Sequence, residues 1–138
     1  MALLGCAAGG AAEPCQVTLT DSKTKATCAV PTTFLAKPPR LVEMPVTKIE
    51  NPSGQGLSIY VHVGGAKAEP ELIGNVSVYP ANETGVFMMR CQRAFEKLGA
   101  ARASARITIE IRRATEGQAW QPILVSIGPL RWLYEEPK

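Results

Sequence analysis

Two stretches of alternating apolar and polar residues constrain this chain more than any other feature. Residues 106–112 read Arg-Ile-Thr-Ile-Glu-Ile-Arg, and residues 57–63 read Leu-Ser-Ile-Tyr-Val-His-Val. Successive side chains of a strand point to opposite faces, so each stretch is predicted to be a strand with one buried and one wet face. Such strands must cover their buried faces against another apolar layer, which favours a β-rich domain.

Shorter apolar runs predict further strands, at residues 41–49, 72–79, 86–90, 123–127 and 130–134. The period changes once, where Cys91, Phe95 and Leu98 fall on one helical face ahead of the stop residue Gly99. The 11 prolines and 12 glycines suit a chain with many turns. We therefore expect a mainly β fold, a small antiparallel β-sandwich or barrel of six to seven strands with one short helix.

Three positions predict irregularities within these strands. Pro45 indicates an edge strand or a bulge, since proline cannot donate to a sheet ladder. Gly74 indicates a bulge or a point of close backbone approach. Gly128 and Pro129 are expected to interrupt one long final strand.

The N-terminal third differs in composition from the rest. Residues 1–14 are small and featureless, residues 15–30 resemble a hairpin, and residues 31–40 contain three prolines, typical of an extended connector. We expect 1–39 to be a tail, hairpin and Pro-rich connector, and 40–138 to form the β-sandwich domain.

The cysteines offer one disulfide. Cys15 and Cys28 bracket the expected hairpin, which would bring them within bonding distance, whereas a reducing cytosol would leave them as free thiols. Cys91 follows an apolar strand and is expected to be a buried, unreactive thiol.

Cys6 lies in a sequence that resembles the end of a bacterial lipoprotein signal, with Leu3, Leu4 and Gly5 before it. A charged start and an apolar stretch of about 7–15 residues do not precede it. Either the sequence starts inside a longer protein, in which case Cys6 is a lipidation site, or the match is chance.

The chain offers few residues for catalysis or metal binding. His62 is the sole histidine and Asp21 the sole aspartate, which argues against multi-histidine metal centres and calcium loops. The sequence contains neither a phosphate-binding glycine loop nor a Gly-x-Ser-x-Gly elbow. We expect no catalytic, cofactor-binding or metal-binding residues and no enzymatic activity; a pocket of convergent carboxylates and His62 would reverse this.

The net charge of +3 is mild, and the densest basic group is Arg102, Arg106, Arg112 and Arg113. Nucleic-acid binding would also need aromatic residues interleaved with the basic ones, and the eight aromatic residues fall mostly on apolar strand patterns. We expect neither a nucleic-acid partner nor a transmembrane segment, since no run reaches the ~18 apolar residues of a membrane span.

Residues 40–135 resemble the C-terminal domain of plant-type polyphenol oxidases, relatives of tyrosinase, a domain named for a Lys-Phe-Asp-Val motif. The matching stretches occur in the same order: 40–44, 57–63, 68–76, 94–100, 106–111 and 125–132. Leu57-Ser58-Ile59-Tyr60 replaces the signature motif, so this chain departs from the family at its most diagnostic point.

The resemblance implies a non-catalytic domain that covers a dicopper site carried elsewhere, on a tyrosinase-like copper oxidase domain, and keeps that enzyme latent. The other interpretation is an exported structural or binding β-sandwich, tethered to lipid if Cys6 is modified. Both interpretations favour an extracytoplasmic or lumenal location.

Overall fold

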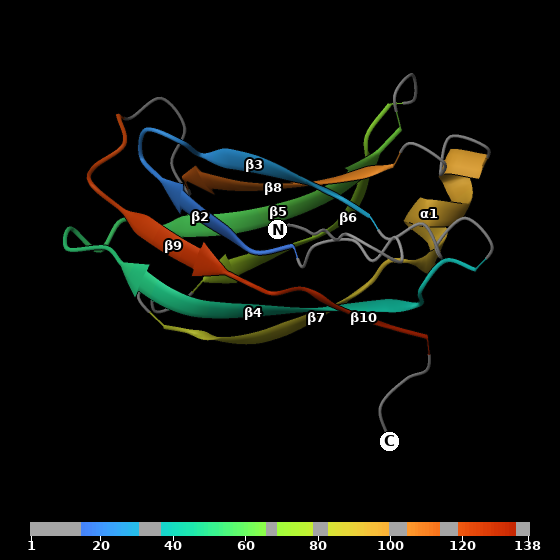
Figure 1. Ribbon diagram of the computed structural model, residues 1–138. Coiled ribbons are helices and arrows are strands. Elements are labelled where there is room, and N and C mark those ends of the chain that lie inside the picture. The colour runs from blue at the N-terminus through green and yellow to red at the C-terminus, as the bar shows by residue number, and fades with distance from the viewer. Residues whose placement is uncertain are drawn as a thin grey trace, which may run out of the picture.

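The computed structural model describes residues 15–30, 37–65, 69–78, 83–99, 105–113 and 119–134. Within these ranges nine strands and one helix form two antiparallel sheets that pack face to face (Figure 1). The fold is thus a β-sandwich, as the alternating strands predict, and the two sheets do not close into a barrel.

The first sheet has five strands arranged around β4. β7 pairs with one edge of β4, and the other edge is shared by β10 and then β9, beyond which lies β2. Their bounds are β2 Val17–Thr20, β4 Leu41–Glu50, β7 Gly85–Arg90, β9 Leu124–Ile127 and β10 Arg131–Leu133.

The second sheet has four strands in the order β3-β8-β5-β6. Their bounds are β3 Lys25–Ala29, β5 Leu57–Gly64, β6 Glu71–Val78 and β8 Arg106–Arg113. β5 and β8, the two strands with the clearest alternation, lie side by side at its centre.

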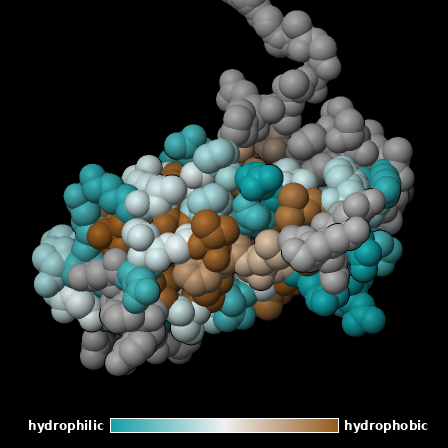
Figure 2. Space-filling view, turned by 90° about the horizontal axis from the view of Figure 1, so that it is seen from below, coloured by the Kyte–Doolittle hydropathy of each residue, from teal (hydrophilic) through white to brown (hydrophobic). Residues whose placement is uncertain are grey.

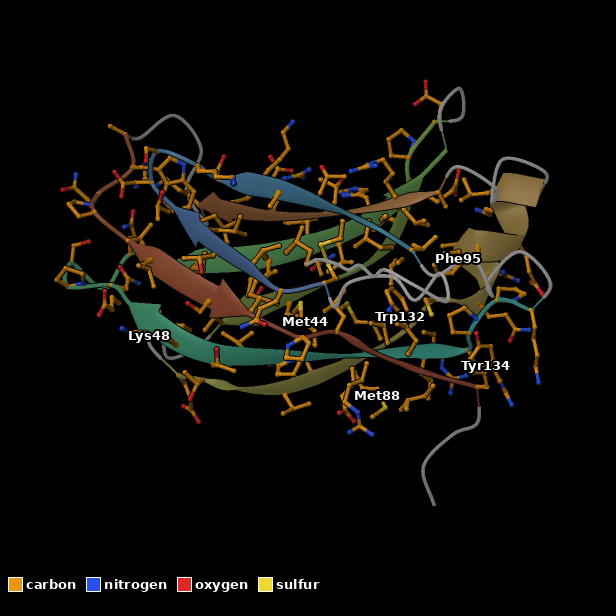
Figure 3. All side chains as sticks on the ribbon, viewed as in Figure 1. Met44, Lys48, Met88, Phe95, Trp132 and Tyr134 are labelled. Carbon is orange, nitrogen blue, oxygen red and sulfur yellow. A yellow bond between two sulfur atoms is a disulfide. The ribbon has the colours of Figure 1, made fainter. Side chains whose placement is uncertain are left out.

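The core lies between the sheets and uses the alternate residues that the sequence assigns to buried faces. Ile107, Ile109 and Ile111 of β8 are at most 1% exposed, as are Ile59 and Val61 of β5. The opposite layer supplies the inward side chains of β4 and β9, among them Val42, Met44, Val46, Val125 and Ile127. Figure 3 shows Met44 pointing into this space.

The sheets include strands upstream of Arg40, where the compact domain was expected to begin. β2 pairs with β9 and β3 pairs with β8, so the segment expected to form a hairpin contributes one strand to each sheet. A four-residue connection, Asp21 to Thr24, carries the chain from one layer to the other. Proximity in sequence favours a hairpin, but each of the two strands pairs with a distant strand on its own side of the core. These two additional strands raise the strand count above the expected six to seven.

Pro45 lies in the central strand β4, at the point where its neighbour changes from β10 to β9. The carbonyl oxygen of Pro45 accepts the N–H of Gly128 at 2.8 Å, so the backbone groups of Pro45 face the break between those strands. Proline is tolerated because its missing N–H faces this break. A register shift between Val46 and Lys48 follows directly, which agrees with the predicted bulge.

Gly74 lies at a bulge, one of the two alternatives expected for its position. The register between β5 and β6 shifts between Val61 and His62, opposite Gly74 and Leu72, which leaves Ile73 as the extra residue of a bulge. A Cβ on Gly74 would also lie 2.8 Å from Sδ of Met89, on the facing sheet. Glycine therefore allows the two layers to approach at this edge.

Helix α1, Gln92–Leu98, closes one end of the sandwich (Figure 1). The predicted apolar face is buried, with Phe95 fully enclosed and Leu98 7% exposed. Gly99 ends the helix with a positive φ of 54°. The Phe95 ring contacts Trp132 of β10 edge to face, with the centroids 5.9 Å apart.

Candidate functional site

The outer face of the five-stranded sheet carries an apolar strip, which we define as Leu41, Pro45, Val86, Met88 and Leu133; Leu41 is buried within it, at 6% exposed. Val86 and Met88 are 61% and 45% exposed, although their strand mates Phe87 and Met89 point inward. The register places Val86 opposite Pro45, and Leu41 opposite Leu133. Figure 3 shows Met88 pointing away from the core, in contrast to Met44.

A charged pair interrupts the apolar strip, because Glu43 lies between Leu41 and Pro45 on β4 and opposite Met88 of β7. Arg131 of β10 pairs with Glu43 of β4, with 2.9 Å between Nη1 and Oε1, and Arg90 lies at the end of β7. Seen from below, the molecule shows apolar residues near the middle of this face, with hydrophilic residues around them (Figure 2). A group of exposed apolar side chains on a sheet face is typical of a protein-binding surface.

The sequence did not single out Val86 and Met88. Their strand reads Val-Phe-Met-Met, an unbroken apolar run that predicts a strand but not which of its faces is buried. In an antiparallel sheet with one wet face, alternation is the rule, so an unbroken run marks a strand that is apolar on both faces. That signal indicates a strand that is either buried on both faces or has one exposed apolar face.

The outer face of the other sheet is more polar. His62 is half-buried beside Tyr60, with parallel rings 6.4 Å apart, and the Arg112 guanidinium lies 4.0 Å from the Tyr60 centroid. Glu110 accepts hydrogen bonds from Nε and Nη2 of Arg112 at 3.1 and 3.0 Å. His62 thus lies on a packed outer surface, as the alternation predicts.

An open hollow of about 530 Å³ lies at the end of the sandwich opposite α1. Two carboxylates line it, but both have structural partners. Asp21 accepts the N–H of Ile123 at 3.2 Å, and Glu50 pairs with Lys48 at 3.3 Å. His62 is not among the lining residues, so the hollow does not bring His62 and the carboxylates together.

The predicted disulfide is present. Cys15 and Cys28 are bonded, with their α-carbons 5.6 Å apart, and the bond links the start of β2 in one sheet to β3 in the other. Cys6, the candidate lipidation site, lies outside the described residues.

Cys91 is a buried free thiol at the start of α1. Its thiol donates to the carbonyl oxygen of Pro39 at 3.5 Å, and burial raises the pKa of the thiol to about 12. The residue therefore remains protonated near neutral pH and is a poor nucleophile, as expected for a small buried hydrophobe.

The basic residues do not form one patch. Arg112 lies over Tyr60 on the outer face, whereas Arg113 turns toward Trp120, with 5.8 Å to the ring centroid. Arg106 is exposed at the far end of β8, and Arg102 is outside the described ranges. Among the residues that the structure describes, we find no cluster of three potential metal ligands and no helix able to span a bilayer.

No protein-family model and no curated protein matches this sequence. Solved structures do match it. Latent apple tyrosinase is 12% identical with a TM-score of 0.47, and the match covers 90% of this chain and 29% of that one. Recombinantly expressed latent aurone synthase, a polyphenol oxidase, is 18% identical with a TM-score of 0.46, over 83% of this chain and 25% of that one.

A third structure, latent aurone synthase from its natural source, is 14% identical with a TM-score of 0.45 and is covered over 24% of its length. This chain therefore spans between about a quarter and 29% of these proteins. It is similar to one part of these polyphenol oxidases.

Proposed function

We propose that this chain is a non-catalytic shielding domain, which covers the entrance to a dicopper site on a tyrosinase-like copper oxidase domain and keeps that enzyme latent. The proposal joins two observations: the ordered sequence resemblance over residues 40–135 and the apolar strip on the outer sheet face. The single observation that carries it is the exposure of Val86 and Met88, at 61% and 45%.

The apolar strip has the chemistry that a cover requires. A shield must exclude water from a substrate entrance, and apolar side chains on a rigid sheet do so while losing little conformational freedom on binding. The Glu43–Arg131 pair, which crosses the strip, and Arg90 at the end of β7 supply charged groups that can fix orientation. A shield of this kind contributes no reacting group of its own.

The decisive experiment measures oxidation of a simple phenol by the catalytic domain of a tyrosinase-like oxidase from the same source, with increasing amounts of this chain. We expect a dose-dependent loss of activity. Replacing the two exposed residues together, Val86→Glu with Met88→Glu, should weaken inhibition at least about tenfold, because two buried carboxylates would face the enzyme without partners.

Leu72→Glu is the matched control. Leu72 is 48% exposed, like Met88, but it lies on β6 of the opposite sheet. The control should inhibit like the original chain, with circular dichroism verifying that all variants fold. If the original chain neither binds nor inhibits the oxidase, the proposal is overturned. If the double variant and Leu72→Glu lose inhibition equally, the apolar strip is not the inhibitory surface.

The disulfide favours a second candidate, an exported structural or binding sandwich. Disulfides persist in oxidising compartments, so the Cys15–Cys28 bond favours an extracytoplasmic or lumenal location. A lipid tether at Cys6 would belong to this second function. Mass spectrometry of the native chain tests it: a diacylglycerol adduct on Cys6 supports the tether, and an unmodified thiol rejects it.

A further inference from the structure

β2 and β3 belong to one continuous segment, residues 15–29, which we call the strap (blue in Figure 1). β2 is the last strand of one sheet and β3 is the last strand of the other, so each pairs with a neighbour on one side only. The Cys15–Cys28 disulfide joins the two ends of the strap. This bond therefore closes the strap on itself and does not tie it covalently to the strands that it covers.

Little apolar surface holds the strap against the core. Leu19 is fully buried and Cys15 is 5% exposed, and no other residue of the strap is buried. By contrast, four of the eight residues of β5 are buried. Local opening occurs in segments that bury few apolar side chains, so the strap is suited to detach as a unit.

The disulfide opposes this detachment. Its cysteines are 13 residues apart, and closing that loop limits the conformations that a detached strap can adopt, so opening gains less entropy while the bond is intact. Cys28 is half-buried on the edge strand β3, whereas Cys15 is 5% exposed. A reductant therefore reaches the disulfide from the side of Cys28.

We propose that the strap is a redox-sensitive element, docked while the Cys15–Cys28 bond is intact and detached from an otherwise folded sandwich once a dithiol reduces that bond. One thiolate of the dithiol attacks Sγ of Cys28, the S–S bond breaks, and Cys15 leaves as a thiolate that takes up a proton. The second thiol then displaces Cys28 from the mixed disulfide. The two cysteines gain the two electrons and two protons that the dithiol loses.

Detachment has a specific signature on β8, because the two sides of this strand face different neighbours. The N–H of Ile111 donates to the carbonyl oxygen of Thr24, the residue before β3, at 2.9 Å. By the two-residue period of a strand, the N–H of Ile109 also faces β3, and that of Glu110 faces Tyr60 of β5. Loss of the strap therefore frees the N–H of Ile109 and leaves that of Glu110 bonded.

The other end of the strap is bonded to the segment that leads into β10. The carbonyl oxygen of Cys15 accepts the N–H of Leu130 at 3.0 Å. β10 contributes Leu133 to the apolar strip and Arg131 to the pair with Glu43. Reduction thus removes a hydrogen bond just before this strand, and the Leu130 amide reports it.

The test is hydrogen exchange of the purified chain, oxidised or reduced with dithiothreitol, with no oxidase present. This separates the inference from the proposed shielding function, which it does not require. After reduction, we expect the amides of Leu19, Ile109 and Leu130 to exchange at least about tenfold faster, while those of Glu110 and Ile59 do not change. Faster exchange of all five amides would mean that the whole fold opens, and no change in any would mean that the strap stays docked. Either result overturns the inference.

Two variants identify the group that responds to the reductant. The double variant Cys15→Ser with Cys28→Ser should show the fast pattern without dithiothreitol and should not respond to it. Cys91 is a buried free thiol, so Cys91→Ala is the matched control and should respond as the original chain does. A response that persists in the double variant, or that disappears in Cys91→Ala, would place the redox-sensitive group elsewhere and overturn the inference.

Discussion

Gly128 lies against the backbone of Cys15 so closely that a Cβ would stand 2.6 Å from the Cys15 carbonyl oxygen. The same oxygen accepts the N–H of Leu130 at 3.0 Å. The segment that connects β9 to β10 is therefore held against Cys15, one of the two disulfide-bonded cysteines. Only glycine suits this position, because its φ is +109° as well.

Replacing Gly128 with alanine should destabilise the fold by about 3 kcal/mol or more, since backbone atoms cannot move aside and the φ is unfavourable. Gly54→Ala is the matched control: its φ is +64°, but nothing lies within 4 Å of the added carbon, so only about 1 kcal/mol should be lost. Urea unfolding of both variants checks the difference. Equal losses would mean that the contact with Cys15 contributes nothing.

Removing the disulfide should lower the free energy of unfolding by about 3 kcal/mol, the chain-entropy value for a loop of this length. The sequence separation of Cys15 and Cys28 is 13 residues. The double variant Cys15→Ser with Cys28→Ser tests this by thermal unfolding, and a reducing agent should destabilise the original chain but not the variant. An unchanged melting temperature in both cases would refute it.

The strands could be predicted because alternation leaves a direct trace in sequence. Ile107, Ile109 and Ile111 point inward because only that placement removes all three from water. The helical period likewise predicts the buried face through Phe95 and Leu98. These are local properties, which a short window of sequence contains.

Pairing between distant strands could not be predicted in the same way. β2 and β3 are adjacent in sequence, yet their partners are β9 and β8, more than 75 residues further along the chain. The apolar strip likewise depends on β7 lying at an edge with Val86 facing outward, which no single window of sequence records. Only the tertiary arrangement shows whether β7 is buried on both faces or has one exposed apolar face.

Phe95 should be the most costly apolar residue to truncate at the helical end of the sandwich. It is fully buried and meets Trp132 at an interplanar angle of 76°. Phe95→Ala should lower stability by about 3–5 kcal/mol, because the cavity it leaves opens the contact between α1 and β10. Denaturant unfolding followed by tryptophan emission checks this, and Phe95→Leu should restore most of the stability.

Cys91 should make the fold less stable at alkaline pH. Burial raises the pKa of its thiol from 9.0 to about 12, so the folded chain holds this proton more tightly than the unfolded one. The stabilisation is fully present below about pH 9 and is lost as pH rises through about 12. The measurement is a difference between two chains. Unfolding of the original chain and of Cys91→Ala is compared from neutral pH upward, and the gap in stability between them should narrow or reverse above about pH 9.

In folded protein at neutral pH, a thiol reagent should leave Cys91 unmodified and label it only on unfolding. Parallel pH profiles for the two chains, or rapid labelling of the folded state, would show that the thiol is not shielded from water.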